Sequence, residues 1–386
     1  MKFYIALFIS KLIYIVLKIL RRPATSFAGF VALKICPDFM KYTKKSINKV
    51  FINITGTNGK TTTSGILAHI LEENNQKIIH NVKGANMPSG IANVFVKNIC
   101  PFKNYDYAVI ETDEAYLTKI YDNVKGDCLI VTNLFCDQLD RYGDANFTAK
   151  TIQEAIDKNP NVKLILNADD PIVSKFGKDK NAVYFGLKNS CDYFADVKTF
   201  DDHIELLVNN SYSFRINLIG EYNAYNTLAA IATAIENGFS NEQIQNALNN
   251  YHTAFGRAET RIIDGHKALI QLIKNPTGVN EVLKTIDVNS HIIFAMNDEY
   301  ADGRDISWLW DVDFSKLLSA KNPIVTSGTR AYDIANRLKY AGFPTEKIVV
   351  EQEIKKAIQL VLNNTTKDEK ITILPSYTAL LKISKY

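Results

Sequence analysis

Residues 53–65 read NITGTNGKTTTSG, and the apolar run KVFINI at residues 49–54 leads directly into them. An apolar run, a glycine loop and a helix-favouring stretch predict a strand, a loop and a helix in that order. Gly56 and Gly59 permit close backbone approach to an anion, and the start of the helix would face the phosphates of a nucleotide. The generic loop pattern has a glycine five residues before Gly59, where this sequence has Ile54. We therefore expect a phosphate-binding loop of a narrower type.

The residues after the second glycine add chemistry to this loop. Lys60 would reach the β- and γ-phosphates, and the Thr61 hydroxyl would hold magnesium. Glu111 ends the apolar run YDYAVIE, and a carboxylate at a strand end is a usual magnesium partner of such a loop, with Asp113 and Glu114 as alternatives. Two alternatives without a functional role would give the same sequence. The loop could be a glycine turn before a helix that carries a lysine by chance, and Glu111 could be a solvated acid in a loop. The predicted nucleotide site comprises Gly56, Thr57, Asn58, Gly59, Lys60, Thr61 and Thr62, and the predicted magnesium ligands are Thr61 and Glu111.

Composition sets the class of protein. The chain has 386 residues, 46% hydrophobic and 22% charged, which is ordinary for a globular protein of two or three domains. The net charge of +4 is small and the basic residues are scattered, which argues against a nucleic-acid partner. The cysteines form no C-x-x-C pair and predict neither disulfides nor zinc; they are Cys36, Cys100, Cys128, Cys136 and Cys191.

The remaining pattern predicts an α/β protein. Short apolar runs, each ending in polar residues, alternate with helical stretches from residue 49 onward, and residues 183–218 alternate as antiparallel strands do. A second α/β unit of five strands with crossovers follows residue 256 and predicts a Rossmann-like domain. We expect an apolar helix and connector at residues 1–40, a nucleotide-binding central domain with a mostly parallel sheet at 41–255, and the Rossmann-like domain at 256–386.

The first 22 residues, MKFYIALFISKLIYIVLKILRR, are strongly apolar. Lys11 and Lys18 interrupt the run, so no uncharged stretch approaches the roughly 20 residues that span a bilayer. Their spacing of seven places both on one helix face, with Arg22 on the same stripe. Such a helix packs on its own protein or makes a peripheral contact with a membrane. A cleaved signal peptide is a third interpretation, which the nucleotide motifs that follow disfavour.

Three further polar clusters follow predicted strands or open a helix. One is TNLFCDQLDRYGD, with Asn133, Asp137, Gln138, Asp140 and Arg141; the others are LNADDP at residues 166–171 and GEYNAYNTLAA, where Asn223 and Asn226 share a helix face. Ligands of open α/β sheets bind at the carboxyl ends of the strands, so the clusters there predict a site.

These motifs together resemble those of a known family. TGTNGKTT, TNLFCDQLDRYG, LNADDP, GEYNAYNTLAA and FGRAE are similar, in this order, to the motif series of the Mur ligases, which use ATP to join amino acids or ammonia-like nucleophiles to carboxylates. That family's loop lacks the first glycine, which accounts for Ile54. The resemblance implies ATP and Mg²⁺, with Lys60 catalytic. By motif position it also assigns Asn223, Arg257 and Asn275 to the nucleotide and interdomain region.

The C-terminal third resembles one branch of that family. LIKNPTGVNEV, NDEYADGRDISWLWDVDF, SGTRAYDIANRLKYAG and LPSYTAL are similar to the MurT group, the synthetase subunits of lipid II isoglutaminyl synthases. The resemblance implies a cytoplasmic enzyme, at the inner face of the membrane, that amidates the D-glutamate α-carboxyl of the lipid II stem peptide through an acyl phosphate. Its ammonia would come from a GatD-type glutaminase partner. The alternatives are another Mur-type or folylpolyglutamate-type ligase, or a nucleotide-binding scaffold without catalysis.

The sequence also departs from the family pattern. Gln138 stands where other Mur ligases have a magnesium-binding histidine, and Lys150 lies a little early to match their carbamylated lysine. The four-cysteine ribbon of MurT-like chains is absent, so we expect no structural zinc. In the family, an aspartate of the C-terminal domain completes the glutaminase site. Asp305 is our choice for that role and Asp302 the second, with Asp311 not excluded.

Overall fold

The computed structural model describes residues 1–22, 24–81, 85–100, 103–134, 145–200, 202–252 and 257–384. The chain forms two compact units, each of which is described by itself. Unit one holds the described residues up to His252 except 218–220, and unit two holds 218–220 and the described residues from Arg257 onward. The domain boundaries expected at residues 40 and 255 stay predictions.

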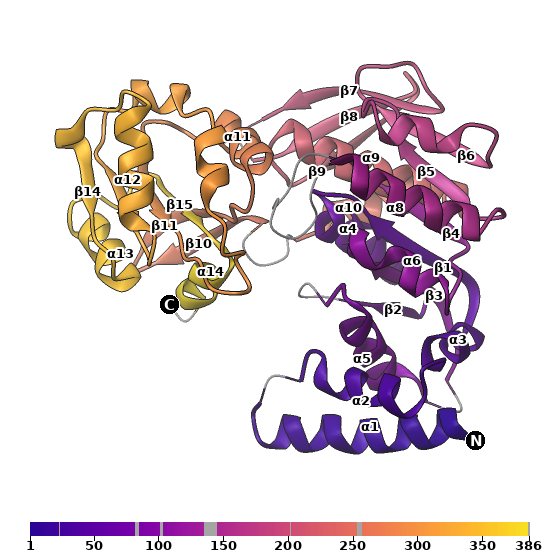
Figure 1. Ribbon diagram of the computed structural model, residues 1–386. Helices are drawn as coiled ribbons and strands as arrows, with labels where there is room; N and C mark the ends of the chain where they lie inside the picture. Colours follow the sequence, from indigo (N-terminus) through magenta and orange to yellow (C-terminus); the bar gives the residue numbers. More distant parts are fainter. Residues whose placement is uncertain are drawn as a thin grey trace. The chain divides into compact units, whose positions relative to one another are not determined.

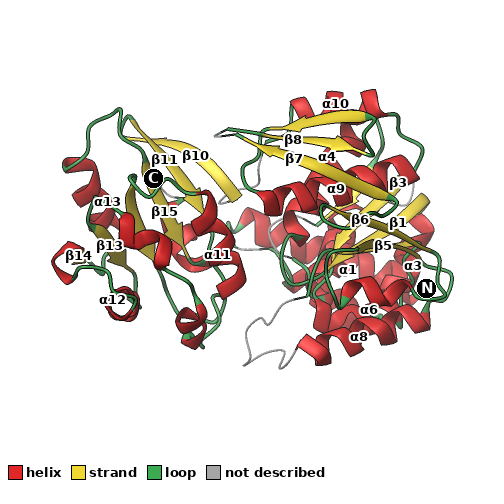
Figure 2. Cartoon of the chain, turned by 90° about the horizontal axis from the view of Figure 1, so that it is seen from above, coloured by secondary structure: helices red, strands yellow, loops and turns green. Residues whose placement is uncertain are grey.

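Unit one is built on a sheet with the strand order β2-β3-β1-β4-β5-β6-β7-β8-β9 (Figures 1 and 2). Strands β2 to β7 pair in parallel, and β7, β8 and β9 pair antiparallel. The antiparallel strands expected at residues 183–218 are confirmed for β7, β8 and β9. The expectation is wrong for β6, which pairs in parallel with β5. The strands are β1 (Ile47–Thr55), β2 (Ile78–His80), β3 (Tyr105–Glu111), β4 (Cys128–Val131), β5 (Lys163–Asn167), β6 (Ala182–Gly186), β7 (Tyr193–Thr199), β8 (Ile204–Val208) and β9 (Tyr212–Ile216).

Helices cover both faces of this sheet, which explains why its central strands are apolar throughout rather than alternating. Helices α4, α9 and α10 lie on one face, and α5, α6 and α8 pack into the core on the other (Figure 1). The α-helices of unit one are α1 (Lys2–Ile19), α2 (Phe27–Ile35), α3 (Phe39–Thr43), α4 (Lys60–Glu73), α5 (Pro88–Asn98), α6 (Leu117–Tyr121), α8 (Ala145–Lys158), α9 (Glu221–Glu236) and α10 (Asn241–Asn249). The short 3₁₀ helices are η1 (Lys44–Ser46), η2 (Glu114–Tyr116) and η3 (Val173–Gly177).

The N-terminal helices form an outer layer of unit one, in which α1 packs on α2 and α2 packs on α5. The close contact of α2 with α5 depends on Gly29, because a Cβ there would lie 2.0 Å from the Ser89 carbonyl oxygen. The helix predicted at the N-terminus is confirmed and contains Lys11 and Lys18. The prediction that Arg22 belongs to the same basic stripe of the helix is wrong, because α1 ends at Ile19. Within the described ranges, no helix combines the length and apolar character needed to cross a bilayer.

Unit two is a six-stranded sheet with the order β10-β11-β15-β12-β13-β14. All its pairings are parallel except β10 with β11, an antiparallel edge that the sequence analysis missed. Helices α11 and α12 pack on one face, and α13 and α14 on the other. The elements are β10 (Arg257–Ile263), β11 (His266–Gln271), α11 (Pro276–Thr285), β12 (His291–Ala295), η4 (Ser307–Asp311), η5 (Ser315–Ser319), β13 (Ile324–Ser327), α12 (Ala331–Tyr340), η6 (Thr345–Lys347), β14 (Ile348–Val350), α13 (Ile354–Asn363), β15 (Ile371–Pro375) and α14 (Tyr377–Ile383). The predicted α/β class with a Rossmann-like second sheet is confirmed.

Candidate functional site

The glycine loop joins the end of β1 to the start of α4, as its sequence predicts. Gly56 has φ 124° and Gly59 has φ 88°, a region that side chains other than glycine rarely adopt. Space is also restricted, because a Cβ on Gly56 would lie 2.3 Å from Thr132 Oγ1 and one on Gly59 would lie 2.0 Å from Asn226 Oδ1. Both glycines are therefore required by backbone conformation and by close packing.

The end of β4 holds the loop in shape. The backbone N–H groups of Thr57 and Asn58 donate to the carbonyl and side-chain oxygens of Asn133, at 2.8 and 2.9 Å. Thr132 Oγ1 and Asn133 Nδ2 donate to the Asn58 carbonyl at 2.7 and 3.1 Å. Two loop amides are thus engaged within the protein. The anion-binding amides expected of this loop are then those in the first turn of α4, which have no partner within their own helix.

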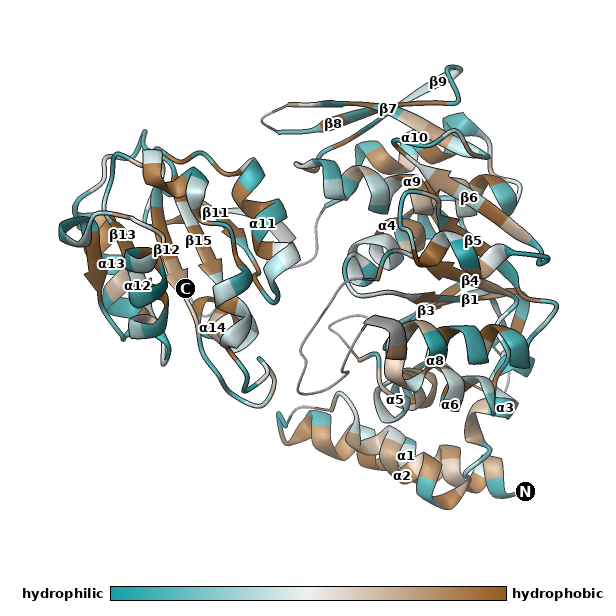
Figure 3. Ribbon diagram, turned by 45° about the horizontal axis from the view of Figure 1, so that its top comes forward, coloured by the Kyte–Doolittle hydropathy of each residue, from teal (hydrophilic) through white to brown (hydrophobic). Residues whose placement is uncertain are grey.

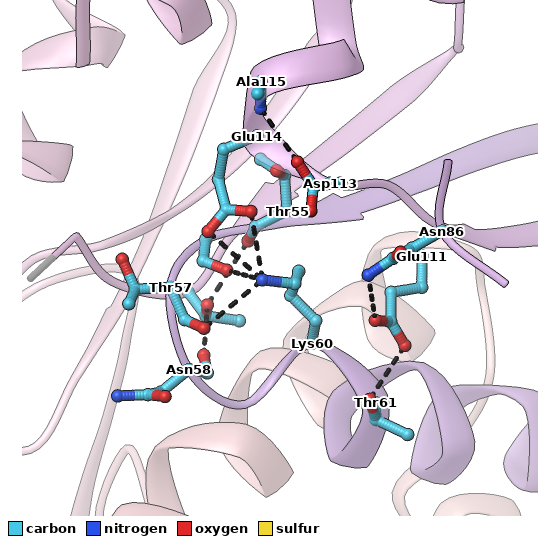
Figure 4. A network of polar contacts seen from close by, with 12 residues as sticks. Thr55, Thr57, Asn58, Lys60, Thr61, Asn86, Glu111, Asp113, Glu114 and Ala115 are labelled. Atoms are coloured by element: carbon cyan, nitrogen blue, oxygen red, sulfur yellow. Dashed lines mark hydrogen bonds and ion pairs between the residues drawn. The ribbon is translucent and has the colours of Figure 1, made fainter. Parts of the chain in front are cut away.

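Lys60 is the first residue of α4, and its side chain turns back toward the loop (Figure 4). Its Nζ donates to the carbonyl of Gly56, to the carbonyl of Thr57 at 3.3 Å, and to both carboxylate oxygens of Glu114 at 3.1 Å. Lys60 and Glu114 are both buried. From sequence alone Glu114 is only an alternative magnesium ligand, whereas in the structure it is the ion-pair partner of Lys60.

The charge on Lys60 is maintained by acids that surround it. Burial lowers the pKa of Lys60, but Glu114, Glu111 and Asp113 raise it, and the net direction is upward. Glu114 reaches the lysine because Asp113 starts the short helix η2 by accepting a hydrogen bond from Ala115 N at 3.2 Å. The site therefore presents a permanently charged ammonium group beneath the loop.

Thr61 and Glu111 meet on the other side of α4, as their predicted shared role requires (Figure 4). Glu111 ends β3, and its Oε2 accepts a hydrogen bond from Thr61 Oγ1 at 2.9 Å. Its Oε1 accepts from Asn86 Nδ2 at 3.0 Å. The Asn81 side chain fixes the end of the strand by bonding both backbone polar groups of Glu111, each at 2.8 Å. Hydroxyl and carboxylate oxygens are ligands that Mg²⁺ prefers, so these residues fit a magnesium ion.

Helix α9 brings a predicted pair of asparagines to the loop. Asn226 Nδ2 donates to Asn223 Oδ1 at 3.2 Å, and Thr63 Oγ1 of α4 donates to Asn226 Oδ1 at 3.5 Å. Both asparagines are buried, and Asn226 fills the space that a side chain at residue 59 would occupy. The structure thus places Asn223 and Asn226 beside the phosphate-binding loop, across 163 residues of sequence.

A buried histidine lies behind α4. His80, at the end of β2, contacts Ser64 Oγ through its Nε2 at 3.2 Å. Ser64 Oγ donates in turn to the Thr61 carbonyl at 3.1 Å. Burial lowers the pKa of His80 from 6.5 to about 4, so the ring is neutral at pH 7. Sequence reasoning missed this residue, because a single histidine at a strand end gives no signal without its neighbours.

The other predicted nucleotide residues lie in unit two. Arg257 starts β10, and its side chain is not among the described ones. Asn275 is the N-cap of α11, with its Oδ1 accepting from Gly278 N at 2.7 Å. This bond gives Asn275 a structural function of its own, and its nucleotide role stays a prediction. Asp137, Gln138, Asp140 and Arg141 lie outside the described residues, and Lys150 is exposed on α8.

The candidate acids of unit two differ in how firmly they are held. Asp302 accepts from the Thr378 N–H at 2.7 Å and from its hydroxyl at 2.5 Å, which ties it to the start of α14. Asp305 accepts from Ser307 N at 2.8 Å, and this hydrogen bond lowers the pKa of Asp305. Asp311 is exposed at the end of η4. Their role toward a glutaminase stays a prediction.

Two of the described cysteines, Cys128 and Cys191, are poorly suited to bind a metal ion. Burial raises the pKa of the Cys128 thiol to about 12 and that of Cys191 to about 11. A protonated thiol is a poor metal ligand and a poor nucleophile. Among the residues that the structure describes, no three His, Cys, Asp or Glu side chains are grouped as a metal site would require.

Comparison with known proteins finds a matching family in each unit. The Mur ligase middle domain family matches residues 54–234, and the MurT ligase C-terminal family matches residues 272–380. A relative from Staphylococcus aureus, named lipid II isoglutaminyl synthase (glutamine-hydrolyzing) subunit MurT, is 32% identical over 98% of this chain and 96% of its own length. A relative of the same name from Streptococcus pneumoniae is 30% identical over 92% and 90%.

A solved structure has the same fold. The crystal structure of MurF ligase from Thermotoga maritima in complex with ADP superposes with a TM-score of 0.73 at 15% identity, over 92% of this chain and 83% of that one. At this identity the likeness concerns the fold alone. The motif order, the loop geometry and the near full-length similarity agree, and we conclude that the chain belongs to the MurT family of Mur-type ligases.

Proposed function

We propose that this chain is the synthetase subunit of a lipid II isoglutaminyl synthase, which amidates the α-carboxyl of D-glutamate in the lipid II stem peptide. Its similarity to relatives of that name extends over nearly the whole chain. The observation that carries a catalytic rather than a scaffolding role is the Lys60–Glu114 pair beneath the loop, with Thr61 and Glu111 beside it. A scaffold without catalysis has no need to keep this buried set of charges.

The proposed reaction has two steps. In the first, a carboxylate oxygen attacks the γ-phosphorus of ATP, the bond to the β,γ-bridging oxygen breaks, and ADP leaves. The product is an acyl phosphate, which converts an anionic, poorly electrophilic carboxylate into an activated one. In the second, the lone pair of ammonia attacks the acyl carbon, and the tetrahedral intermediate expels phosphate and loses a proton. The amide remains.

Lys60 stabilises the negative charge that gathers during phosphoryl transfer. Glu114 keeps the ammonium group charged and holds it beneath the loop, and the carbonyl groups of Gly56 and Thr57 also accept hydrogen bonds from it. Thr61 and Glu111 would bind Mg²⁺, which when bound neutralises part of the charge on the β- and γ-phosphates. Asn223, Arg257 and Asn275 are proposed to contact the nucleotide.

Ammonia is proposed to come from a GatD-type glutaminase subunit. Burial raises the thiol pKa of Cys36, Cys128 and Cys191, so these thiols are protonated at neutral pH and unsuited to attack glutamine. Asp305 is proposed to complete the glutaminase site, with Asp302 as the second candidate. We place the reaction in the cytoplasm, where ATP is supplied, at the inner face of the membrane that holds lipid II.

Mass spectrometry of the product tests this proposal. The purified chain is incubated with ATP, Mg²⁺, lipid II and ammonium, and we expect the mass change from a carboxylic acid to an amide. Glutamine in place of ammonium should give no product until a glutaminase partner is added. A mass increment of one amino acid would instead assign the chain to another Mur-type or folylpolyglutamate-type ligase. Unchanged lipid II with ammonium present would refute catalysis.

A further inference from the structure

Helix α1 has two different apolar faces. Ala6, Leu7 and Ser10 are buried, and Phe3, Ile13 and Tyr14 pack beside them against the core of unit one. The opposite face, here called the outer face of α1, consists of apolar residues spaced three to four apart, so they lie on one side of the helix. Their exposed fractions run from 37% for Ile9 to 73% for Ile19; the set is Tyr4, Ile5, Phe8, Ile9, Leu12, Ile15, Val16 and Ile19.

This amount of exposed apolar surface calls for an explanation. A helix that packs on a globular protein usually turns polar residues outward, and one that is apolar all round is buried or lies against lipid. Figure 3 shows brown, hydrophobic colouring along most of α1. Lys11 and Lys18 lie together along one edge of the outer face rather than within it.

The charged residues in the segment of sequence that contains the outer face are all basic. Residues 1–37 contain Lys2, Lys11, Lys18, Arg21, Arg22 and Lys34, and the first acidic residue of the chain is Asp38. Acids and bases are nearly balanced in residues 38–386, which hold 39 of the 45 Lys and Arg and all 41 Asp and Glu of the chain. The partner that complements this segment is therefore apolar in its interior and negatively charged at its surface.

We propose that the outer face of α1 binds the surface of an anionic lipid bilayer, with the helix lying in the plane of the interface. The apolar side chains enter the boundary between headgroups and acyl chains, and the flanking lysines and arginines contact lipid phosphates. Two lysines inside α1 and the packing of its inner face on the protein exclude a helix that spans the bilayer.

A second copy of this chain is a poorer occupant of the same face. Two copies joined through α1 would bring two groups of basic residues together without acids to pair them, and like charges repel. An anionic bilayer satisfies the apolar and the basic parts at once. Membrane binding is inferred from α1 and its flanking residues alone. The purpose of that binding, which is to bring the ligase to a lipid-linked substrate, rests on the proposed function.

Vesicle flotation of the full chain tests the proposal. We expect the protein to float with vesicles that contain phosphatidylglycerol and to remain at the bottom with phosphatidylcholine alone. Ile15→Glu/Ile19→Glu, at 51% and 73% exposed positions, should reduce binding at least about ten-fold. Lys11→Gln/Lys18→Gln should reduce it roughly 10- to 30-fold and weaken its dependence on salt.

Matched control variants test whether a loss of vesicle binding comes from the outer face of α1 or from the change in net charge alone. Ile262→Glu, at a 69% exposed position on β10, and Lys339→Gln on α12 should bind vesicles like the unchanged protein. No flotation with anionic vesicles, or equal flotation of the Ile15→Glu/Ile19→Glu variant, would overturn the proposal. So would a dimer in analytical ultracentrifugation that this variant dissociates without any vesicle binding. Because no lipid II is present, these outcomes do not depend on the ligase reaction.

Discussion

The ammonium group of Lys60 shows how single residues can serve stability and chemistry together. It lies in a buried ion pair with Glu114, whose two carboxylate oxygens are each 3.1 Å from Nζ. Removing one member of a buried pair leaves the other charge without compensation, which usually costs about 3–5 kcal/mol. The chemical role and the structural role of this pair are therefore separable by substitution.

Lys60→Ala should abolish measurable amidation and lower the free energy of unfolding by about 3 kcal/mol, because Glu114 loses its partner. Lys60→Ala/Glu114→Gln removes both charges and should regain most of that stability without regaining activity. Urea unfolding and product mass spectrometry measure the two effects, and circular dichroism checks that both variants remain folded. Retained amidation in either variant would remove Lys60 from the mechanism.

His80 makes stability depend on pH. The unfolded chain binds a proton at this residue below about pH 6.5, whereas burial keeps the folded ring neutral down to about pH 4. The unfolded state therefore binds more protons in this window, and stability falls as the pH is lowered from 6.5 to 4, by up to about 3 kcal/mol.

The His80→Gln variant should be less sensitive to acid than the unchanged protein between pH 6.5 and 4, because glutamine keeps a polar contact with Ser64 but does not titrate. The measurement is the urea midpoint at a series of pH values, compared between the two proteins so that other titrating groups cancel. Parallel pH curves for both proteins would show that His80 does not titrate as inferred.

At the scale of elements, α9 fixes the loop at the start of α4. It brings Asn226 Oδ1 to within 2.0 Å of where a Cβ on Gly59 would lie. The same helix is followed by Gly238, whose φ is nearly the same, 87° against 88°, but no atom of the described residues lies within 4 Å of its Cβ position. A comparison of alanine substitutions at the two positions therefore distinguishes the cost of backbone strain, which both share, from the cost of crowding, which arises only at Gly59.

Gly238→Ala should cost about 1 kcal/mol, the strain of a left-handed alanine alone. Gly59→Ala should cost clearly more and should abolish ADP binding, because the alanine displaces either the loop or Asn226. Urea unfolding and calorimetric titration with Mg²⁺ and ADP report the two quantities. Equal costs in the two variants would mean that α9 does not restrict the loop.

At the scale of the whole molecule, the proposed partnership with a glutaminase depends on which aspartate faces it. Asp305 and Asp313 have the same local geometry, since each accepts from the backbone N–H two residues later, at 2.8 and 2.9 Å. An asparagine side chain accepts the same hydrogen bond from the backbone two residues later, so the substitution should cost little stability. Asp302 is different, because two hydrogen bonds tie it to Thr378.

Asp305→Asn should lower glutamine hydrolysis by the co-purified complex without changing the melting temperature of this chain. The reason is that a carboxylate that orients a histidine also stabilises its charged form, which an amide cannot do. Asp313→Asn is the matched control and should leave hydrolysis unchanged. If only Asp302→Asn impairs hydrolysis with the fold preserved, the role passes to Asp302.

Much of the fold was predictable because its signals are local. The apolar runs that became β1, β3, β4 and β5 are buried strands, and the glycine loop lies between β1 and α4 as expected. The antiparallel edge β10 was missed, and β6 was assigned to the wrong kind of pairing. Strand pairing depends on neighbours far away in the sequence, which local alternation does not identify.

The sequence by itself determined the class of protein, the loop and its lysine, and the family, because these depend on residue type and order. Only the tertiary structure decided that Glu114 pairs with Lys60, that Asn226 packs against Gly59, and that α1 exposes an apolar face. Lys60 and Glu114 are 54 residues apart, and Gly59 and Asn226 are 167 residues apart. Lys60 meets Glu114 because the carboxyl ends of the parallel strands β1 and β3 lie at one edge of the sheet, and Gly59 meets Asn226 because α9 packs on α4. A helical pattern shows which residues share a face but not which face is covered.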